Sequence, residues 1–219
     1  WRVAAMLDQW QTLFGMPDRA EKLELIRALL THGANVNART TKPLPRSFGE
    51  GFTGSTPFII ATGSGDVEVM RLLLEHGADP NIRSARGWTA IMAGCSGNAD
   101  SSTIVTEEQR VEAVKAAVAA GIDVENADDN GYRAMHVAAQ SGFHSLIRLL
   151  LANGAELSPV TKDRTERSPK TGTIVLNGLT PLGTVDGTFF GGAGLTERQT
   201  TAAFLRSIGA KPGKPNLER

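Results

Sequence analysis

Residues 54–83, GSTPFIIATGSGDVEVMRLLLEHGADPNIR, contain the residue pattern from which the fold of this chain is predicted. The pair Thr56 and Pro57 marks a helix start, because the threonine hydroxyl can cap the first turn and proline lacks only an N–H that has no helical partner there. Gly77 follows a leucine-rich run at a point where the backbone turns left-handed, so it marks a helix end. Between these points Val69, Leu72 and Leu73 form an apolar stripe at helical spacing. The stretch therefore predicts two helices joined by a turn, with an apolar face that one such unit cannot bury alone.

The pattern recurs along the whole chain. The helix-end motif occurs five times, as ALLTHGANVN (28–37), LLLEHGADPN (72–81), AAVAAGIDVE (116–125), LLLANGAELS (149–158) and FLRSIGA (204–210). A glycine before a helix start occurs at Gly54, Gly87, Gly131 and Gly178. Gly54 and Gly77 are 23 residues apart and Gly87 follows 10 residues later, so the basic unit has 33 residues. Recurrence at a fixed period of this size predicts a stacked solenoid.

A 33-residue unit with T-P-L-H-x-A and L-L-L-x-x-G-A-D-x-N signatures resembles the ankyrin repeat, here of the bacterial type with about five repeats and loop insertions. The resemblance implies an all-α fold, an ankyrin-repeat solenoid of stacked helix-turn-helix units with β-turn fingers. We expect a single domain over residues 1–210 and a polar tail over 211–219. The units predicted are about 1–38, 51–83, 84–127, 128–161 and 175–210.

Insertions and caps locate the irregular parts. The third unit has 11 extra residues between its helices, around 97–105, and the fifth has 8 around 187–195. Two fingers are lengthened, near 39–53 and 159–177. Capping-box pairs are predicted at Asp18 with Glu21, Thr106 with Gln109 and Thr196 with Gln199. Apolar residues between Val3 and Leu13 have helical spacing and predict the inner helix of an atypical terminal unit.

Composition excludes several classes of function. The 23 basic and 23 acidic residues balance, so no global charge points to nucleic acid or an anionic membrane. No apolar run approaches the roughly 20 residues of a membrane-spanning helix. Cys95 is the only cysteine, which rules out an intrachain disulfide and leaves the compartment open. Because the chain begins with Trp1, we expect that a targeting segment, an upstream domain or a stretch lost by truncation once preceded it. A soluble protein, cytoplasmic or exported, is the expectation.

The resemblance also implies which residues face the concave surface: Ser55, Trp88, Tyr132 and Leu179 after the finger glycines, then Ser64 and Gln140 in the last turn of an inner helix. Trp88 and Tyr132 occupy equivalent places on neighbouring units and could anchor a partner, since both combine apolar area with a polar tip. The alternative is that each ring packs on a neighbouring finger.

The fingers differ in charge. Arg83 and Arg86 make one finger basic, Asp128 and Asp129 make the next acidic, and the two lengthened fingers are both basic. Such an edge could steer a partner of opposite pattern, although charged turns are also simply well solvated. The predicted partner-binding set is Arg83, Arg86, Trp88, Asp128, Asp129, Tyr132 and Gln140.

No motif for catalysis, a cofactor or a metal is found. His136 occupies the histidine of T-P-L-H and is expected to tie neighbouring turns together. His32 and His76 stand at equivalent points on helices about 8 to 10 Å apart, too far to share a zinc ion. The glycine-rich segment 187–194 lacks the strand and lysine of a phosphate loop and is interpreted as a loop with an apolar Phe189–Phe190 pair. Cys95 occupies a small-residue place in a helix and is interpreted as buried packing.

The function predicted is a non-enzymatic module that binds a protein partner through its concave face and fingers. The alternative is a structural or regulatory subunit of a larger assembly, in which KPLPR (42–46) and SPKTGT (168–173) become ordered against neighbours. An enzyme finds no support in the sequence. Partner identity and oligomeric state are not fixed by it.

Overall fold

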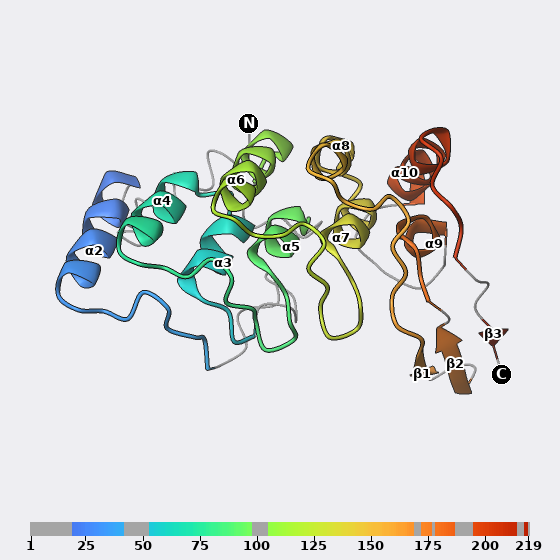
Figure 1. Cartoon of the computed structure of the whole chain (residues 1–219), viewed down its shortest axis with the longest axis horizontal. Coiled ribbons are helices and arrows are strands. Elements are labelled where there is room, and N and C mark those ends of the chain that lie inside the picture. Colours follow the sequence, from blue (N-terminus) through green and yellow to red (C-terminus); the bar gives the residue numbers. More distant parts are fainter. Residues whose placement is uncertain are drawn as a thin grey trace, which may run out of the picture.

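The computed structural model of the chain describes residues 19–41, 53–97, 105–168, 172–176, 178–186, 195–213 and 217–218. Its helices form two parallel rows (Figure 1). The outer row contains α2 (Arg19–Thr31), α4 (Val67–Glu75), α6 (Glu107–Ala119), α8 (His144–Ala152) and α10 (Leu195–Ser207). The inner row contains α3 (Pro57–Gly63), α5 (Ala90–Cys95), α7 (Ala134–Ser141) and α9 (Pro181–Asp186), and each of these packs on the next. The predicted all-α solenoid is confirmed, whereas the predicted inner helix of the first unit lies outside the described residues.

Side-chain caps stand at the N-termini of these helices, two of them at positions that the sequence predicts. Thr56 accepts a hydrogen bond from the Ile59 N–H, with Pro57 in the first turn of α3. Thr106 and Gln109 form the predicted capping box of α6. Asp66, for which no cap was predicted, caps α4 by accepting from the Val69 N–H at 3.2 Å. Of the other two predicted boxes, Asp18 and the Thr196 side chain lie outside what the structure describes.

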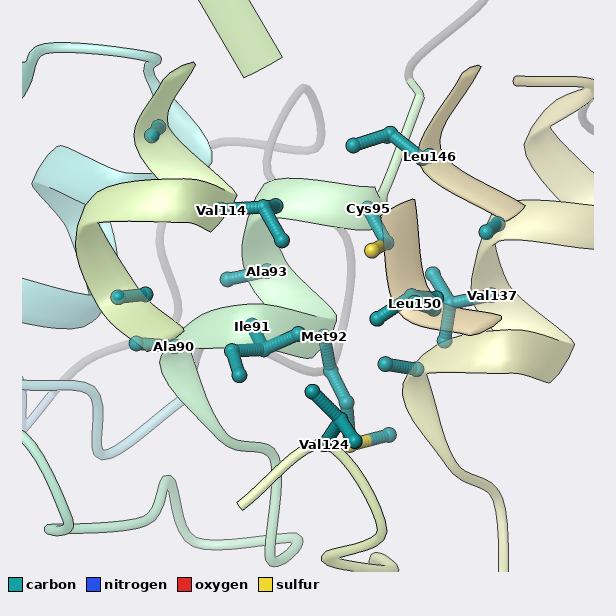
Figure 2. Close-up of a cluster of buried hydrophobic side chains, with 14 of the residues drawn as sticks. Ala90, Ile91, Met92, Ala93, Cys95, Val114, Val124, Val137, Leu146 and Leu150 are labelled. Carbon is teal, nitrogen blue, oxygen red and sulfur yellow. The ribbon is translucent and has the colours of Figure 1, made fainter. Parts of the chain in front are cut away.

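The core is an elongated strip centred on α5. All six residues of α5 are buried. Figure 2 shows the α5 side chains between Val114 of α6 on one side and Val137, Leu146 and Leu150 of the next unit on the other. Burying an aliphatic side chain of this size stabilises the fold by about 1.5–3 kcal/mol. The units are therefore held together by apolar contacts across their shared faces, as the sequence predicted.

All five predicted helix-end glycines adopt the left-handed conformation. Their φ angles lie between +83° and +88° at Gly33, Gly77, Gly121, Gly154 and Gly209. A side chain would be strained at such an angle, which explains why every unit ends on glycine.

A small antiparallel sheet is the feature that the sequence did not predict. The lengthened finger at 159–177 forms the strands β1 (Arg164–Ser168) and β2 (Gly172–Leu176), with Arg164 opposite Leu176. A third strand, β3 (Leu217–Glu218), pairs with β2 and gives the order β1-β2-β3. The predicted polar tail thus returns to the last finger. The hairpin also pairs Ser168 with Gly172 inside the chain, so their pairing needs no neighbouring protein.

Candidate functional site

One hydrogen-bonding arrangement closes each of the four fingers whose base the structure describes, and we call it the finger clamp. Its residue pairs are Thr40 with Ser55, Ser84 with Trp88, Asp128 with Tyr132, and Thr161 with Leu179. In each pair the N–H of the first residue donates to the carbonyl of the second at 2.7–3.0 Å. The N–H of the second donates to the side-chain oxygen of the first at 2.8–3.1 Å. The clamp therefore fixes the finger base whatever the length of the finger.

Backbone hydrogen bonds also join each finger to the next. In the second, third and fourth clamps the residue after the first clamp residue donates its N–H to the preceding finger: Ala85 to the Thr53 carbonyl at 2.8 Å, Asp129 to that of Arg86 at 3.3 Å and Lys162 to that of Asn130 at 2.9 Å. The fingers consequently line up along one edge of the stack, at the bottom of Figure 1. Side chains that project from them are held at a regular spacing.

Several basic side chains of the fingers take part in this linkage while they stay exposed. Arg83 donates to the Ala127 carbonyl at 3.1 Å and to the Asn126 side chain at 2.7 Å. The guanidinium group of Arg39 donates to the Arg83 carbonyl in turn. Lys162 donates to the Asp129 carbonyl at 2.8 Å. Part of the basic charge predicted for this edge thus also holds neighbouring fingers together.

Asp128 is a structural residue of its finger, which corrects the prediction that it faces a partner. Only 7% of its surface is exposed. Its carboxylate accepts from the N–H groups of Asn130 at 2.9 Å and Tyr132 at 2.8 Å, and also from the side chain of Trp88. Burial raises the pKa of this carboxyl group, while these hydrogen bonds act in the opposite direction. Of the two aspartates, Asp129 is the exposed one.

The two aromatic candidates are half-buried and pack against the core, so the packing interpretation accounts for part of each ring. Trp88 reaches Asp128 of the next finger, and the Tyr132 ring lies 5.2 Å from the His136 ring at an angle of 56°. Gln140 is also half-buried, near the end of α7.

Two other expectations for the concave surface are wrong. Ser55 is fully buried and Leu179 is 5% exposed, because both close the base of a lengthened finger. Ser64 is exposed, at the end of α3.

His136 has the structural role predicted for it. Its Nδ1 accepts from the Arg133 N–H at 3.1 Å, and its Nε2–H donates to the Leu179 carbonyl at 3.0 Å. This fixes the tautomer and ties α7 to the base of the next finger. Burial lowers the pKa of His136 to about 4, so the ring is neutral at physiological pH.

Cys95 is buried as predicted, and burial raises the pKa of its thiol to about 12. A thiol of this kind is not a nucleophile at neutral pH.

Arg110 is a residue of structural importance that sequence reasoning missed. It is 6% exposed, and its Nη1 lies 2.5 Å from the Ser96 carbonyl oxygen and 3.4 Å from those of Gly63 and Gly94. These carbonyls belong to the C-terminal ends of α3 and α5, where a positive charge is favourable. The guanidinium group also lies 5.4 Å from the centre of the Phe143 ring. An arginine inside a helical pattern gives no sign in the sequence that it points inward.

The described part of the chain contains no cluster of three or more His, Cys, Asp or Glu residues suited to a metal ion. Among the helices that can be described, none is long and apolar enough to cross a membrane.

Comparison with protein families agrees with the geometry. A model described as ankyrin repeats (3 copies) matches residues 19–106, and a second, ankyrin repeats (many copies), matches residues 101–151. Together they cover more than half of the 219 residues. The chain belongs to the ankyrin repeat family, whose repeats are protein–protein interaction modules. No curated protein matched the chain in the sequence comparison.

Proposed function

We propose that this chain is a non-enzymatic module that binds a protein partner through its finger edge and the adjoining concave face. The finger edge is defined here as the exposed charged residues Arg83, Arg86, Asp129 and Lys162. The observation that supports this function is the combination of finger clamps and finger-to-finger hydrogen bonds, which holds these charges in a fixed row. A preorganised row of charges can steer and orient a partner with little further loss of conformational entropy.

The half-buried rings of Trp88 and Tyr132 supply the apolar part of the proposed surface. Both are already held by contacts within the chain, so a partner that covers their exposed portions immobilises little. Gln140 adds a polar group from the end of α7. An apolar centre with charges around it is the usual anatomy of a protein-binding patch.

The test is a double charge reversal, Arg86→Glu with Asp129→Lys, in the full chain. Partners would be captured from native extract with the wild type, this variant and the control Arg71→Glu, which changes an exposed arginine on the outer helix α4. We expect the double variant to lose at least tenfold in captured partner, with the control unchanged and thermal unfolding similar in all three. Equal capture by the folded double variant would contradict a role for the finger edge.

A structural or regulatory subunit of a larger assembly is the second candidate, and one observation favours it. Leu25 and Leu29, four residues apart on α2, are each 54% exposed. Neighbouring apolar side chains at one end of a stack are suited to permanent burial against another subunit. An assembly that resists high salt and dissociates when both leucines are changed to Ser would support this candidate. An assembly that dissociates in salt alone would favour the charged finger edge.

A further inference from the structure

A pocket of about 260 Å³ lies at the C-terminal end of the stack, where the three strands of the sheet meet the last repeat. Its lining comes from residues 158–163 before β1, from Gly178 and Thr180 after β2, and from residues 211–213 before β3. No residue of the finger edge except the neighbour Lys162 lies in these segments. The pocket is thus a separate feature of the surface.

Hydrogen bonds hold the walls of this pocket from three sides. The Asp163 carboxylate accepts from the Gly178 N–H at 2.6 Å. Thr180 donates to the Lys211 carbonyl at 3.0 Å, and the Lys211 N–H donates to the Ser158 hydroxyl at 2.8 Å. The segments before β1, after β2 and before β3 are therefore fixed relative to one another. A pocket with such walls is available to a ligand without rearrangement.

The lining combines apolar surface with one cation and one anion. Val160 is 57% exposed, and the exposed Pro212 also lines the pocket. Lys211 is exposed as well. One carboxylate oxygen of Asp163 already accepts a hydrogen bond from the Gly178 N–H. In volume the pocket exceeds the roughly 150 Å³ cavity that holds a benzene ring in another protein. One large aliphatic or aromatic side chain would fit.

We propose that this pocket binds a segment of a protein partner in which a large apolar residue is adjacent to Asp or Glu. The apolar side chain covers Val160 and Pro212, and the acidic side chain pairs with the Lys211 ammonium group. Charge selects this occupant: the Lys211 ammonium group of the lining is exposed, whereas the Asp163 carboxylate already accepts a hydrogen bond from the Gly178 N–H, and the exposed Lys162 next to it in the chain adds a second positive charge. A basic segment would be repelled. The inference rests on the proposed protein-binding function and adds the chemistry of one partner segment.

The experiment is selection of a displayed library of random linear peptides against the full chain. We expect the enriched peptides to share Leu, Ile, Phe or Trp next to Asp or Glu. Val160→Glu should weaken their binding about tenfold or more, since it places a charge where the apolar side chain sits. Lys211→Glu should shift selection toward Lys or Arg at the acidic position. Ile208→Glu is the matched control, because it changes an exposed aliphatic residue after α10 that does not line the pocket.

Several results would overturn the inference: no enriched peptide, enrichment without the apolar-acidic pair, or equal loss of binding in Val160→Glu and Ile208→Glu. The double variant Arg86→Glu with Asp129→Lys separates the two proposals. It should keep the selected peptides and lose the native partner. Loss of the peptides in that variant would place their site on the finger edge instead of in the pocket.

Discussion

The two standard fingers and the two lengthened ones differ greatly in size but close in the same way. The clamp residues are 4 apart at Ser84–Trp88 and Asp128–Tyr132, and 15 and 18 apart at Thr40–Ser55 and Thr161–Leu179. Closing the longer loops costs only about 1 kcal/mol more, because loop-closure entropy grows slowly with length. The repeat therefore fixes the base of a finger and leaves its length free. The longest finger uses that freedom to build a hairpin and a pocket.

The lengthened finger at 161–179 has one contact that the standard fingers lack. His136 stands at the third position of α7 and donates to the Leu179 carbonyl. The corresponding residues of α3 and α5 are Ile59 and Met92, which cannot donate such a bond. The finger with the largest closure cost is therefore the one with the additional link.

Removal of this link has the largest expected effect. His136→Ala loses two buried hydrogen bonds and leaves a cavity, so we expect a loss of about 4 kcal/mol in the free energy of unfolding. His76→Ala is the control, because the His76 ring hydrogen-bonds within its own helix, to the Leu72 carbonyl. Urea unfolding of both variants measures the difference. A loss for His136→Ala no greater than that for His76→Ala would show that the link is unimportant.

Acid should weaken the same link. The pKa of His136 is about 4 in the folded chain and about 6.5 in an unfolded one, so the unfolded chain binds the proton first as the pH falls. The contribution of His136 to the free energy of unfolding is complete above about pH 6.5, and it falls by roughly 3 kcal/mol as the pH is lowered from about 6.5 to 4. Urea unfolding at pH 7.5 and 4.5 should therefore show a smaller gap between wild type and His136→Ala at the lower pH. A gap that widens in acid would contradict a neutral buried His136.

Clamps of the two kinds of finger should differ in the stability that they provide. Asp128→Ala removes the acceptor for two backbone N–H groups and the Trp88 side chain, and should cost about 2 to 3 kcal/mol. Thr161→Val removes the acceptor for the Leu179 N–H alone and should cost about 1 kcal/mol. Chemical denaturation of the two variants tests the order. A larger loss for Thr161→Val would mean that the longer finger depends more on its clamp than its contacts indicate.

The smallest expected difference in stability is between the alanine variants of two glycines that have nearly equal φ angles. Gly131 in a finger has φ +83°, and Gly154 at a helix end has φ +87°. A Cβ at Gly131 would lie 2.8 Å from the Lys162 backbone nitrogen of the next finger, whereas Gly154 has nothing within 4 Å. Gly154→Ala should lower the free energy of unfolding by about 1 kcal/mol through backbone strain alone, and Gly131→Ala should lower it by about 2 kcal/mol or more. Thermal unfolding compares the two, and equal losses would indicate that the fingers yield readily.

The sequence predicts the repeats well because each signal is local. Threonine caps, helix-end glycines and apolar stripes act within a few residues, and the structure confirms them from Thr56 to Gly209. The insertions around 97–105 and 187–195 fall between α5 and α6 and between α9 and α10, whereas the insertion at 159–177 contains β1 and β2. The pairing of β3 with β2 was missed because it spans some 40 residues of intervening chain, a contact that no local pattern reports.

The candidate surface was harder to predict for the same reason. A charged residue in a turn has the same sequence signal whether it faces solvent or, as Asp128 does, accepts hydrogen bonds from two N–H groups of its own finger and from the Trp88 side chain of the preceding one. The clamp has a visible signal only in the standard fingers, where Ser84 and Asp128 precede a glycine by three residues. In the lengthened fingers Thr40 and Thr161 are too far from their partners for that spacing to be seen. Inward-pointing Arg110 has no sequence signal at all.

Hydrogen exchange of the backbone amides tests the common clamp most directly. The N–H groups of Thr161 and Leu179 in the lengthened finger should be protected to a similar degree as those of Asp128 and Tyr132 in the standard one. Rapid exchange at Thr161 and Leu179, with slow exchange at Asp128 and Tyr132, would contradict a clamp common to both kinds of finger. It would mean that the longer finger is not closed at its base.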